Sequence, residues 1–136
     1  MTLHEQLIRD EGFRAKPYRD TRGNLTIGFG RCLDTKGITR AEALTLFEHD
    51  VADAAADVDA TWPWAGALDE PRRAVLVAMA FNLGLRGLMG FARMLAAVKD
   101  GDFDLAAVEM EDSDWRLQVG ERAKRLARQM RTGAWQ

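Results

Sequence analysis

The stretch EGFRAKPYRDTRGNLTIGFG, residues 11–30, decides what fold and what chemistry we expect of this chain. Residues 20–24 (DTRGN) have the composition of a tight turn, and the residues on either side of them suit two paired strands. Glu11 stands just before Gly12, which would end a short helix. The stretch therefore predicts a helix end followed by a β-hairpin, with carboxylates at Glu11 and Asp20.

The second predicted strand has two different sides, because alternate residues of a strand point in opposite directions. One side carries the apolar residues Leu25, Ile27 and Phe29 and is expected to face a core. The other side carries Thr26, Gly28 and Gly30, a hydroxyl followed by two positions without a side chain. Such a surface lets a bulky ligand lie close to the backbone.

Glu11, Asp20 and Thr26 are candidates for acid–base chemistry. A carboxyl group in the last turn of a helix faces the negative end of the helix dipole, which disfavours ionisation and suits a proton donor. Asp20 and Thr26 would hold a water across the cleft from it, and these are the parts that hydrolyse a glycosidic bond. Taken singly, each residue also has a plain structural explanation, as a surface glutamate, a turn cap and a strand residue.

The composition is that of one soluble globular domain, with 136 residues, 47% apolar residues and 29% charged residues. A net charge of −2 argues against strong non-specific binding to nucleic acid or anionic membranes. The stretch from Arg116 to Arg131 is nonetheless basic. Such a run of charge is more often a solvated helix face than a surface that attracts an anionic polymer, and both explanations stay open. The two histidines, His4 and His49, lack metal-ligand spacing, so we expect no metal.

The residues MTLHEQLIRDEG lack the apolar core expected of a secretory signal, and the longest apolar run, Ala74 to Phe81, is too short to span a membrane. Cys32 is the only cysteine, which excludes an internal disulfide and fits a reducing compartment. A protein that acts outside the cytoplasm would then need another agent to release it.

After the hairpin the sequence predicts helices. Thr39 and Glu42 form a capping box at the start of a long helix that would run to about Asp59. Asp69 would cap a central helix that is apolar on all sides, and the last helix would stop at Gly133. A small β-containing part followed by a helical body makes the expected fold class α+β.

The pattern EG-R---Y-D--G--TIG-G, which holds Glu11, Asp20 and Thr26, resembles the signature of the phage-type lysozymes, glycoside hydrolase family 24. The segments RRAVLVAMAFNLG and RAKRLARQMRTGAW resemble the central and C-terminal helices of that family, so the resemblance covers nearly the whole chain. The segment RCLDTKGITRAEA leads directly from hairpin to long helix, where the family's type member inserts an extra helix.

The resemblance implies a single lysozyme domain, residues 1–136, with two lobes. A small β-containing lobe would take about residues 13–40, and a bridging helix about residues 40–59. A helical lobe would take about residues 60–136 together with the N-terminal helix 1–11.

The resemblance also implies a muramidase that cleaves the β-1,4 bond between N-acetylmuramic acid and N-acetylglucosamine of peptidoglycan, without a cofactor. By matching positions, Glu11 is the general acid, and Asp20 with Thr26 orients the attacking water. That arrangement favours inversion at the anomeric carbon. The matching substrate-binding residues are Gly30, Phe81, Asn82 and Arg122.

Four positions depart from the type member of the family. Arg31 replaces a histidine, Cys32 a leucine, Asn82 a glutamine, and Glu109 an asparagine that contacts sugar. These departures concern substrate preference and leave the implied reaction class unchanged.

The expected partner is the glycan strand of peptidoglycan, bound by a monomer with no nucleic acid and no stable membrane insertion. As a phage or prophage endolysin, the protein would stay in the host cytoplasm until a holin-type membrane lesion let it reach the periplasm and cell wall. Two other functions remain open. A non-catalytic peptidoglycan-binding module would not need Glu11, Asp20 and Thr26, and a lytic transglycosylase would need the acid alone.

Overall fold

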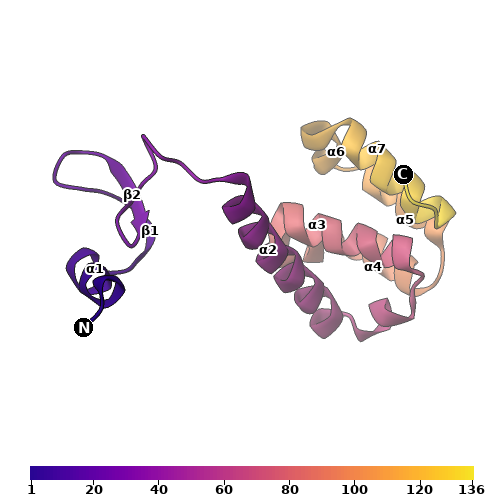
Figure 1. Ribbon diagram of the computed structural model, residues 1–136. Coiled ribbons are helices and arrows are strands. Elements are labelled where there is room, and N and C mark those ends of the chain that lie inside the picture. Colours follow the sequence, from indigo (N-terminus) through magenta and orange to yellow (C-terminus); the bar gives the residue numbers. More distant parts are fainter. The chain divides into compact units, whose positions relative to one another are not determined.

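The computed structural model describes all 136 residues, which form two compact units, Met1–Leu46 and Phe47–Gln136 (Figure 1). A small antiparallel sheet lies near the N-terminus, and almost all other regular structure is helical. The predicted α+β class is confirmed.

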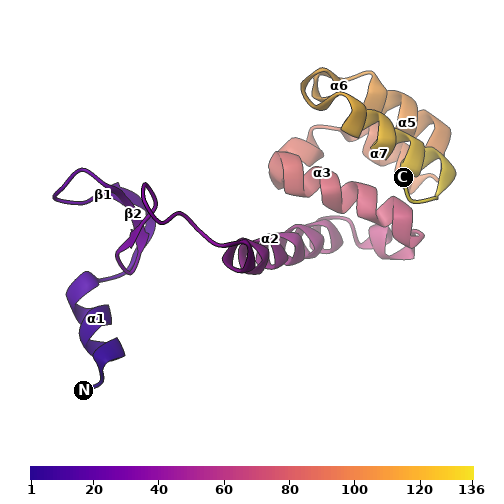
Figure 2. The ribbon, with the colours of Figure 1, turned by 45° about the horizontal axis from the view of Figure 1, so that its top comes forward.

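The first unit contains helix α1 (Leu3–Glu11) and the strands β1 (Arg14–Arg19), β2 (Leu25–Gly28) and β3 (Arg31–Cys32). The strands are antiparallel in the order β1-β2-β3, and β1 and β2 lie side by side in both views (Figures 1 and 2). The predicted hairpin is present. The sequence did not predict β3, because two residues are too few to show a periodicity.

Helix α1 has the ends that its sequence specifies. Thr2 Oγ1 accepts a hydrogen bond from the Glu5 N–H at 3.2 Å, and Glu5 Oε2 accepts one from the Thr2 N–H at 2.6 Å. This capping box satisfies N–H groups that have no partner inside the helix. Gly12, with φ at 68°, ends the helix and leaves Glu11 as its last residue.

Helix α2 (Arg40–Thr61) begins at the predicted capping box. The Thr39 N–H donates to Glu42 Oε1 at 2.9 Å, and the Glu42 N–H donates to Thr39 Oγ1 at 3.1 Å. No helix stands between β3 and α2, and α2 is unbroken up to the 3-10 helix η1 (Pro63–Ala67). The boundary between the two units falls within α2, and the division into lobes that the sequence suggested stays a prediction.

The apolar residues that recur along one face of this long helix are mostly not buried. These residues are Leu44, Phe47, Val51, Ala54, Ala55 and Val58. Ala54 and Val58 are buried, whereas Leu44 and Phe47 are exposed.

The second unit contains the rest of α2 and helices α3 (Glu70–Met89), α4 (Ala92–Lys99), α5 (Phe103–Glu111), α6 (Asp114–Val119) and α7 (Glu121–Thr132). Helix α7 contacts α3, α5 and α6 (Figure 1). Asp69 caps α3 by accepting the Arg72 N–H at 3.0 Å, as predicted. Gly84, with φ at 75°, bends α3.

The hydrophobic core lies entirely in this second unit. Its largest fully buried side chains are Leu76, Met79, Leu88, Met94, Met110 and Met130. No single helix has the length and apolar character of a membrane span, and α3 with α4 would reach them only as a pair bent by 105°.

Arg72 ties the start of α3 to the end of α7. Its Nε donates to the Met130 carbonyl at 2.7 Å, and Nη2 donates to the Arg131 carbonyl at 2.8 Å. Its guanidinium also lies 3.7 Å from the centroid of the Phe103 ring. The last carbonyls of α7, which have no partner inside the helix, are thereby satisfied by a cation.

Candidate active site

The Glu11 carboxylate lies against Gly30, in the turn between β2 and β3. A Cβ atom built on Gly30 would stand 2.5 Å from Glu11 Oε2 and 2.8 Å from its Cδ. Real Cβ atoms do not approach other heavy atoms so closely, so this space exists because Gly30 has no side chain. The backbone at Gly30 also has φ at 72°, a conformation that favours glycine. The structure therefore brings these two predicted site residues together.

Gly28 does not contact Glu11. The prediction that Gly28 and Gly30 lie on the same side of the strand and form one ligand surface is therefore wrong. Positive φ values at Gly28 and Gly30 end the strand alternation after Ile27. A Cβ on Gly28 would meet nothing within 4 Å, and Gly28 lines an apolar pocket together with Ile27 and Phe29.

Asp20 is fixed in the hairpin turn by the backbone that follows it. Its Oδ1 accepts hydrogen bonds from the N–H groups of Arg22 and Asn24, each at 2.9 Å. These bonds, the one from Asn24 above all, lower the pKa of Asp20 below its usual 3.8. Asp20 is therefore a carboxylate at neutral pH, which suits a group that accepts a proton or orients a water.

Thr26 lies on the middle strand, with only 3% of its surface exposed. Thr26 was expected on an open surface that faces the ligand, but within the first unit it is buried. The hydroxyl donates to the Asn24 carbonyl at 2.9 Å, which leaves its lone pairs to accept a hydrogen bond.

Asn24 joins these two residues, and sequence reasoning missed it. Its N–H donates to Asp20, and its carbonyl accepts from Thr26. One peptide segment therefore sets the positions of both side chains. The sequence held a signal for this contact. An aspartate at the start of a turn commonly accepts hydrogen bonds from the backbone N–H groups of that turn.

Arg31 has partners within the first unit. Its Nη1 donates to the Gly37 carbonyl at 3.0 Å and to Glu42 Oε1 at 3.0 Å, and its Nη2 pairs with Glu42 Oε2. The Arg31 guanidinium, with added hydrogen bonds from Thr39, holds the pKa of Glu42 at about 2. Arg31, which stands where the type member has a histidine, therefore forms an ion pair between β3 and the start of α2.

Cys32 is paired with Thr26 across the sheet. Its thiol is free and accepts a hydrogen bond from Thr35 Oγ1 at 3.2 Å. That bond lowers the pKa of Cys32. The departure from leucine therefore places a polar sulfur next to a candidate site residue.

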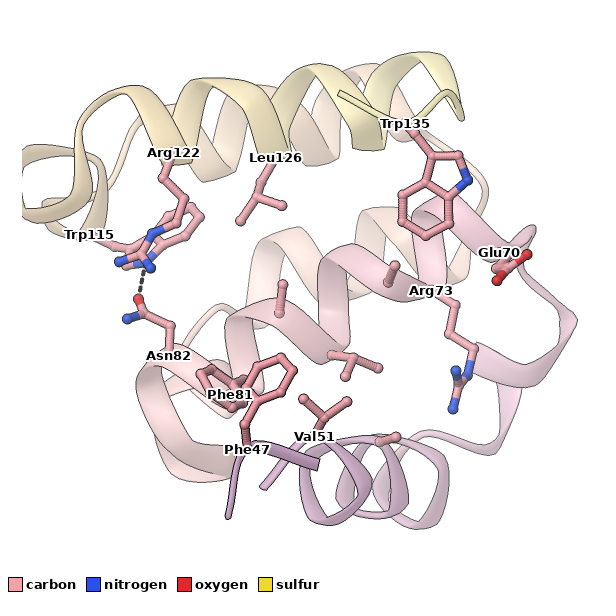
Figure 3. Close-up of a pocket in the computed structure, with 14 residues that line it drawn as sticks. Phe47, Val51, Glu70, Arg73, Phe81, Asn82, Trp115, Arg122, Leu126 and Trp135 are labelled. Atoms are coloured by element: carbon pink, nitrogen blue, oxygen red, sulfur yellow. Dashed lines mark hydrogen bonds between the residues drawn. The ribbon is translucent and has the colours of Figure 1, made fainter. Parts of the chain in front are cut away.

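Three of the predicted substrate-binding residues, Phe81, Asn82 and Arg122, line one pocket of the second unit (Figure 3). The pocket has a volume of about 440 Å³ and lies among α2, α3 and α7. Phe81 packs edge-on against Phe47, with ring centroids 5.7 Å apart. Most other lining residues are apolar, including Val51, Ala55, Ala74, Val77, Ala78, Leu126 and Trp135.

Asn82 has a partner that the sequence did not reveal. Trp115 Nε1 donates to Asn82 Oδ1 at 2.9 Å, and Trp115 is 4% exposed (Figure 3). Because a buried indole N–H needs an acceptor, Asn82 has a structural role here. Glu109 does not line this pocket. It lies on α5 in a smaller pocket with Phe91 and Arg93.

Known proteins resemble the chain over almost all of its length. The model of the phage lysozyme family matches residues 9–132. The pre-baseplate central spike protein of Enterobacteria phage T4 is 34% identical to this chain, in an alignment that covers 98% of the chain but only 28% of the spike protein. Two probable T4-type lysozymes of Dictyostelium discoideum are each 26% identical, with 97% of this chain and 95% of the relative aligned. Since the family match includes both the hairpin and the last helix, the chain belongs to the phage lysozyme family, a family of peptidoglycan hydrolases.

Proposed function

We propose that this protein is a muramidase that hydrolyses the β-1,4 bond between N-acetylmuramic acid and N-acetylglucosamine. Its family membership supports this most strongly. The first unit adds the chemical groups that the reaction needs. A carboxyl group lies at a helix end over Gly30, and Asp20 and Thr26 are joined through Asn24.

In the proposed mechanism Glu11 donates its proton to the glycosidic oxygen as the bond from that oxygen to the anomeric carbon breaks. A water held by Asp20 and Thr26 attacks the anomeric carbon from the opposite face and loses a proton to Asp20. The lowered pKa of Asp20 supports its role as the ionised partner. The products are an inverted reducing sugar and a free 4-hydroxyl group.

Digestion of purified sacculi by the full chain tests this reaction. Hydrolysis gives reducing muramic acid ends, whereas a lytic transglycosylase gives anhydro ends, and mass spectrometry separates the two. A binding module would give neither product. Proton NMR of a soluble glycan should show the α-anomer first, and a β-anomer would contradict inversion.

We also propose that the protein acts as an endolysin. It would work as a monomer on peptidoglycan strands, and a holin-type membrane lesion would give it access from the host cytoplasm to the wall. Expression in bacteria should then lyse the cells only after the inner membrane is permeabilised. Lysis without that treatment would contradict this context.

The spike-protein relative favours a second context, in which the same activity belongs to a phage particle. Mass spectrometry of purified virions distinguishes the two. The protein should be absent from virions if it is an endolysin, and present in them if it is a tail component.

A further inference from the structure

We propose that Gly30 and the Phe13–Phe29 ring pair are positioning residues that set the place of the Glu11 carboxyl group. The inference rests on the proposed function for its effect on catalysis. The placement of the carboxyl group itself is measurable without any substrate.

The first observation is the space that Gly30 leaves for Glu11. Five glycines of the first unit have positive φ: Gly12, Gly23, Gly28, Gly30 and Gly37. A Cβ on Gly12, Gly23 or Gly28 would meet nothing within 4 Å, and one on Gly37 would only touch a carbonyl at 4.0 Å. A Cβ on Gly30 would overlap the Glu11 carboxyl group. Backbone conformation therefore explains glycine at the other positions, whereas Gly30 also makes room for a candidate catalytic group.

The second observation is the aromatic contact beside this approach. The rings of Phe13 and Phe29 have centroids 5.4 Å apart, tilted by 43°. Phe13 follows Glu11 by two residues, and Phe29 directly precedes Gly30. The ring pair therefore joins the chain just after α1 to the chain just before Gly30. Both rings are more than half exposed, and together with the β1–β2 pairing of Arg14 with Gly28 they limit how far the helix end and the turn can move apart.

Proton donation depends strongly on this placement. The donor oxygen must come within about 2.6–3.2 Å of the glycosidic oxygen. A shift of about 1 Å in such a group can lower the rate by about 100-fold. Because a glutamate side chain is flexible, a side chain at position 30 would move the Glu11 carboxyl group and leave the fold in place.

The main test compares Gly30→Ala with Gly28→Ala in the full chain. Both changes place alanine at a nearly equal positive φ, 72° and 68°, but only one places a methyl group against Glu11. The readout is the side-chain carboxyl ¹³C resonance of Glu11 in protein labelled at glutamate, assigned with Glu11→Gln. We expect Gly30→Ala to move this resonance and Gly28→Ala to leave it. An unmoved resonance in Gly30→Ala, or an equal movement in both, would overturn the inference.

Steady-state kinetics on a soluble glycan give the catalytic readout. Gly30→Ala should lower kcat by about 10- to 100-fold with little change in KM, and should lower it more than Gly28→Ala does. A raised KM with an unmoved Glu11 resonance would show that Gly30 contacts substrate and does not position the acid. A moved resonance with unchanged kcat would leave the positioning intact and would contradict Glu11 as the proton donor.

Phe29→Leu is the second variant, and it removes the ring pair while keeping an apolar side chain. We expect a smaller movement of the same resonance and a smaller loss of kcat than in Gly30→Ala. If Gly30→Ala fails to fold while Gly28→Ala folds, the added methyl group does more than move Glu11, and the role of Gly30 as a positioning residue is overturned. Phe29→Leu then tests the ring pair by itself, and an unmoved Glu11 resonance in it would exclude that role.

Discussion

The two units of the chain are stabilised by different interactions. Every buried apolar side chain belongs to the second unit, and the only buried residue of the first unit is Thr26. The first unit depends on hydrogen bonds and charges, in its capping boxes, in the Asp20 turn and in the Arg31–Glu42 ion pair. Burial of apolar surface contributes more stability than exposed polar contacts do.

From these different interactions we expect the two units to differ in their sensitivity to mutation. The candidate acid, carboxylate and hydroxyl all belong to the first unit. Changes there should alter activity more than stability, and changes in the core of the second unit should do the reverse. All four tryptophans lie in the second unit and the single tyrosine, Tyr18, lies in the first, so each unit has its own spectroscopic reporter.

Glu11→Gln should have the largest effect. It keeps the shape of the side chain and removes the transferable proton, so the rate should fall by about 10²–10⁴-fold, while the ring resonances of Tyr18 show unchanged unfolding of the first unit. Glu5→Gln, on the same helix, is the matched control and should keep full activity. Activity above about 1% of the parent in folded Glu11→Gln would contradict general acid catalysis by this residue.

Met79→Ala should show the opposite pattern. Met79 is fully buried in the core of the second unit, and burial of such a side chain contributes about 1.5–3 kcal/mol. We expect urea unfolding, followed by tryptophan fluorescence, to lose at least this much free energy. Turnover per folded molecule should change little. An unchanged unfolding midpoint would show that the core does not carry the stability of this unit.

Thr26→Val should lower the rate about tenfold, if its hydroxyl contributes one hydrogen bond of about 1.5 kcal/mol to the transition state. Thr26→Ser keeps the hydroxyl and should recover most of the rate. The valine removes one of the two donors to the Asn24 carbonyl, which keeps the Asp20 N–H at 3.0 Å, so only a small loss of stability should accompany it. Equal activity of the valine and serine variants would exclude a role for the hydroxyl.

Local signals in the sequence predicted most of the fold. The capping box at Thr39 and Glu42, the cap at Asp69 and the helix ends at Gly12 and Gly133 were all predicted and are present. Each depends on residues within one turn of the chain, so a short sequence window contains the whole cause.

Apart from the local bonds of Asn24 to Asp20 and Thr26, the contacts that were missed join residues far apart in the chain. The Arg31–Glu42 pair spans 11 positions, and the bond from Trp115 to Asn82 spans 33. Periodicity shows which residues face inward but does not say which polar partner each will meet. The approach of Gly30 to Glu11 depends likewise on the positive φ values of Gly28 and Gly30, which the pattern of apolar residues did not reveal.

Glu42→Gln should have the smallest effect, one that depends on pH. The Arg31 side chain is the main cause that lowers the pKa of Glu42 from 4.5 to about 2 in the folded chain. Because the folded pKa is below the unfolded one, the stability that Glu42 contributes is complete above pH 4.5. It is lost as the pH falls from 4.5 toward 2. Glutamine keeps an oxygen for the Thr39 N–H but cannot ionise, so the variant has no such contribution to lose.

The variant should therefore be less stable than the parent near neutral pH, and the difference should close as the pH falls from 4.5 toward 2. The ring resonances of Tyr18, followed through urea unfolding at several pH values, report this for the first unit. The effect should be small, because the Arg31 and Glu42 side chains are 26% and 39% exposed and water screens the pair. Glu48→Gln, an exposed change on the same helix, is the control and should follow the parent at every pH. If Glu42→Gln loses stability in acid as steeply as the parent, the ion pair is not what makes the first unit sensitive to pH.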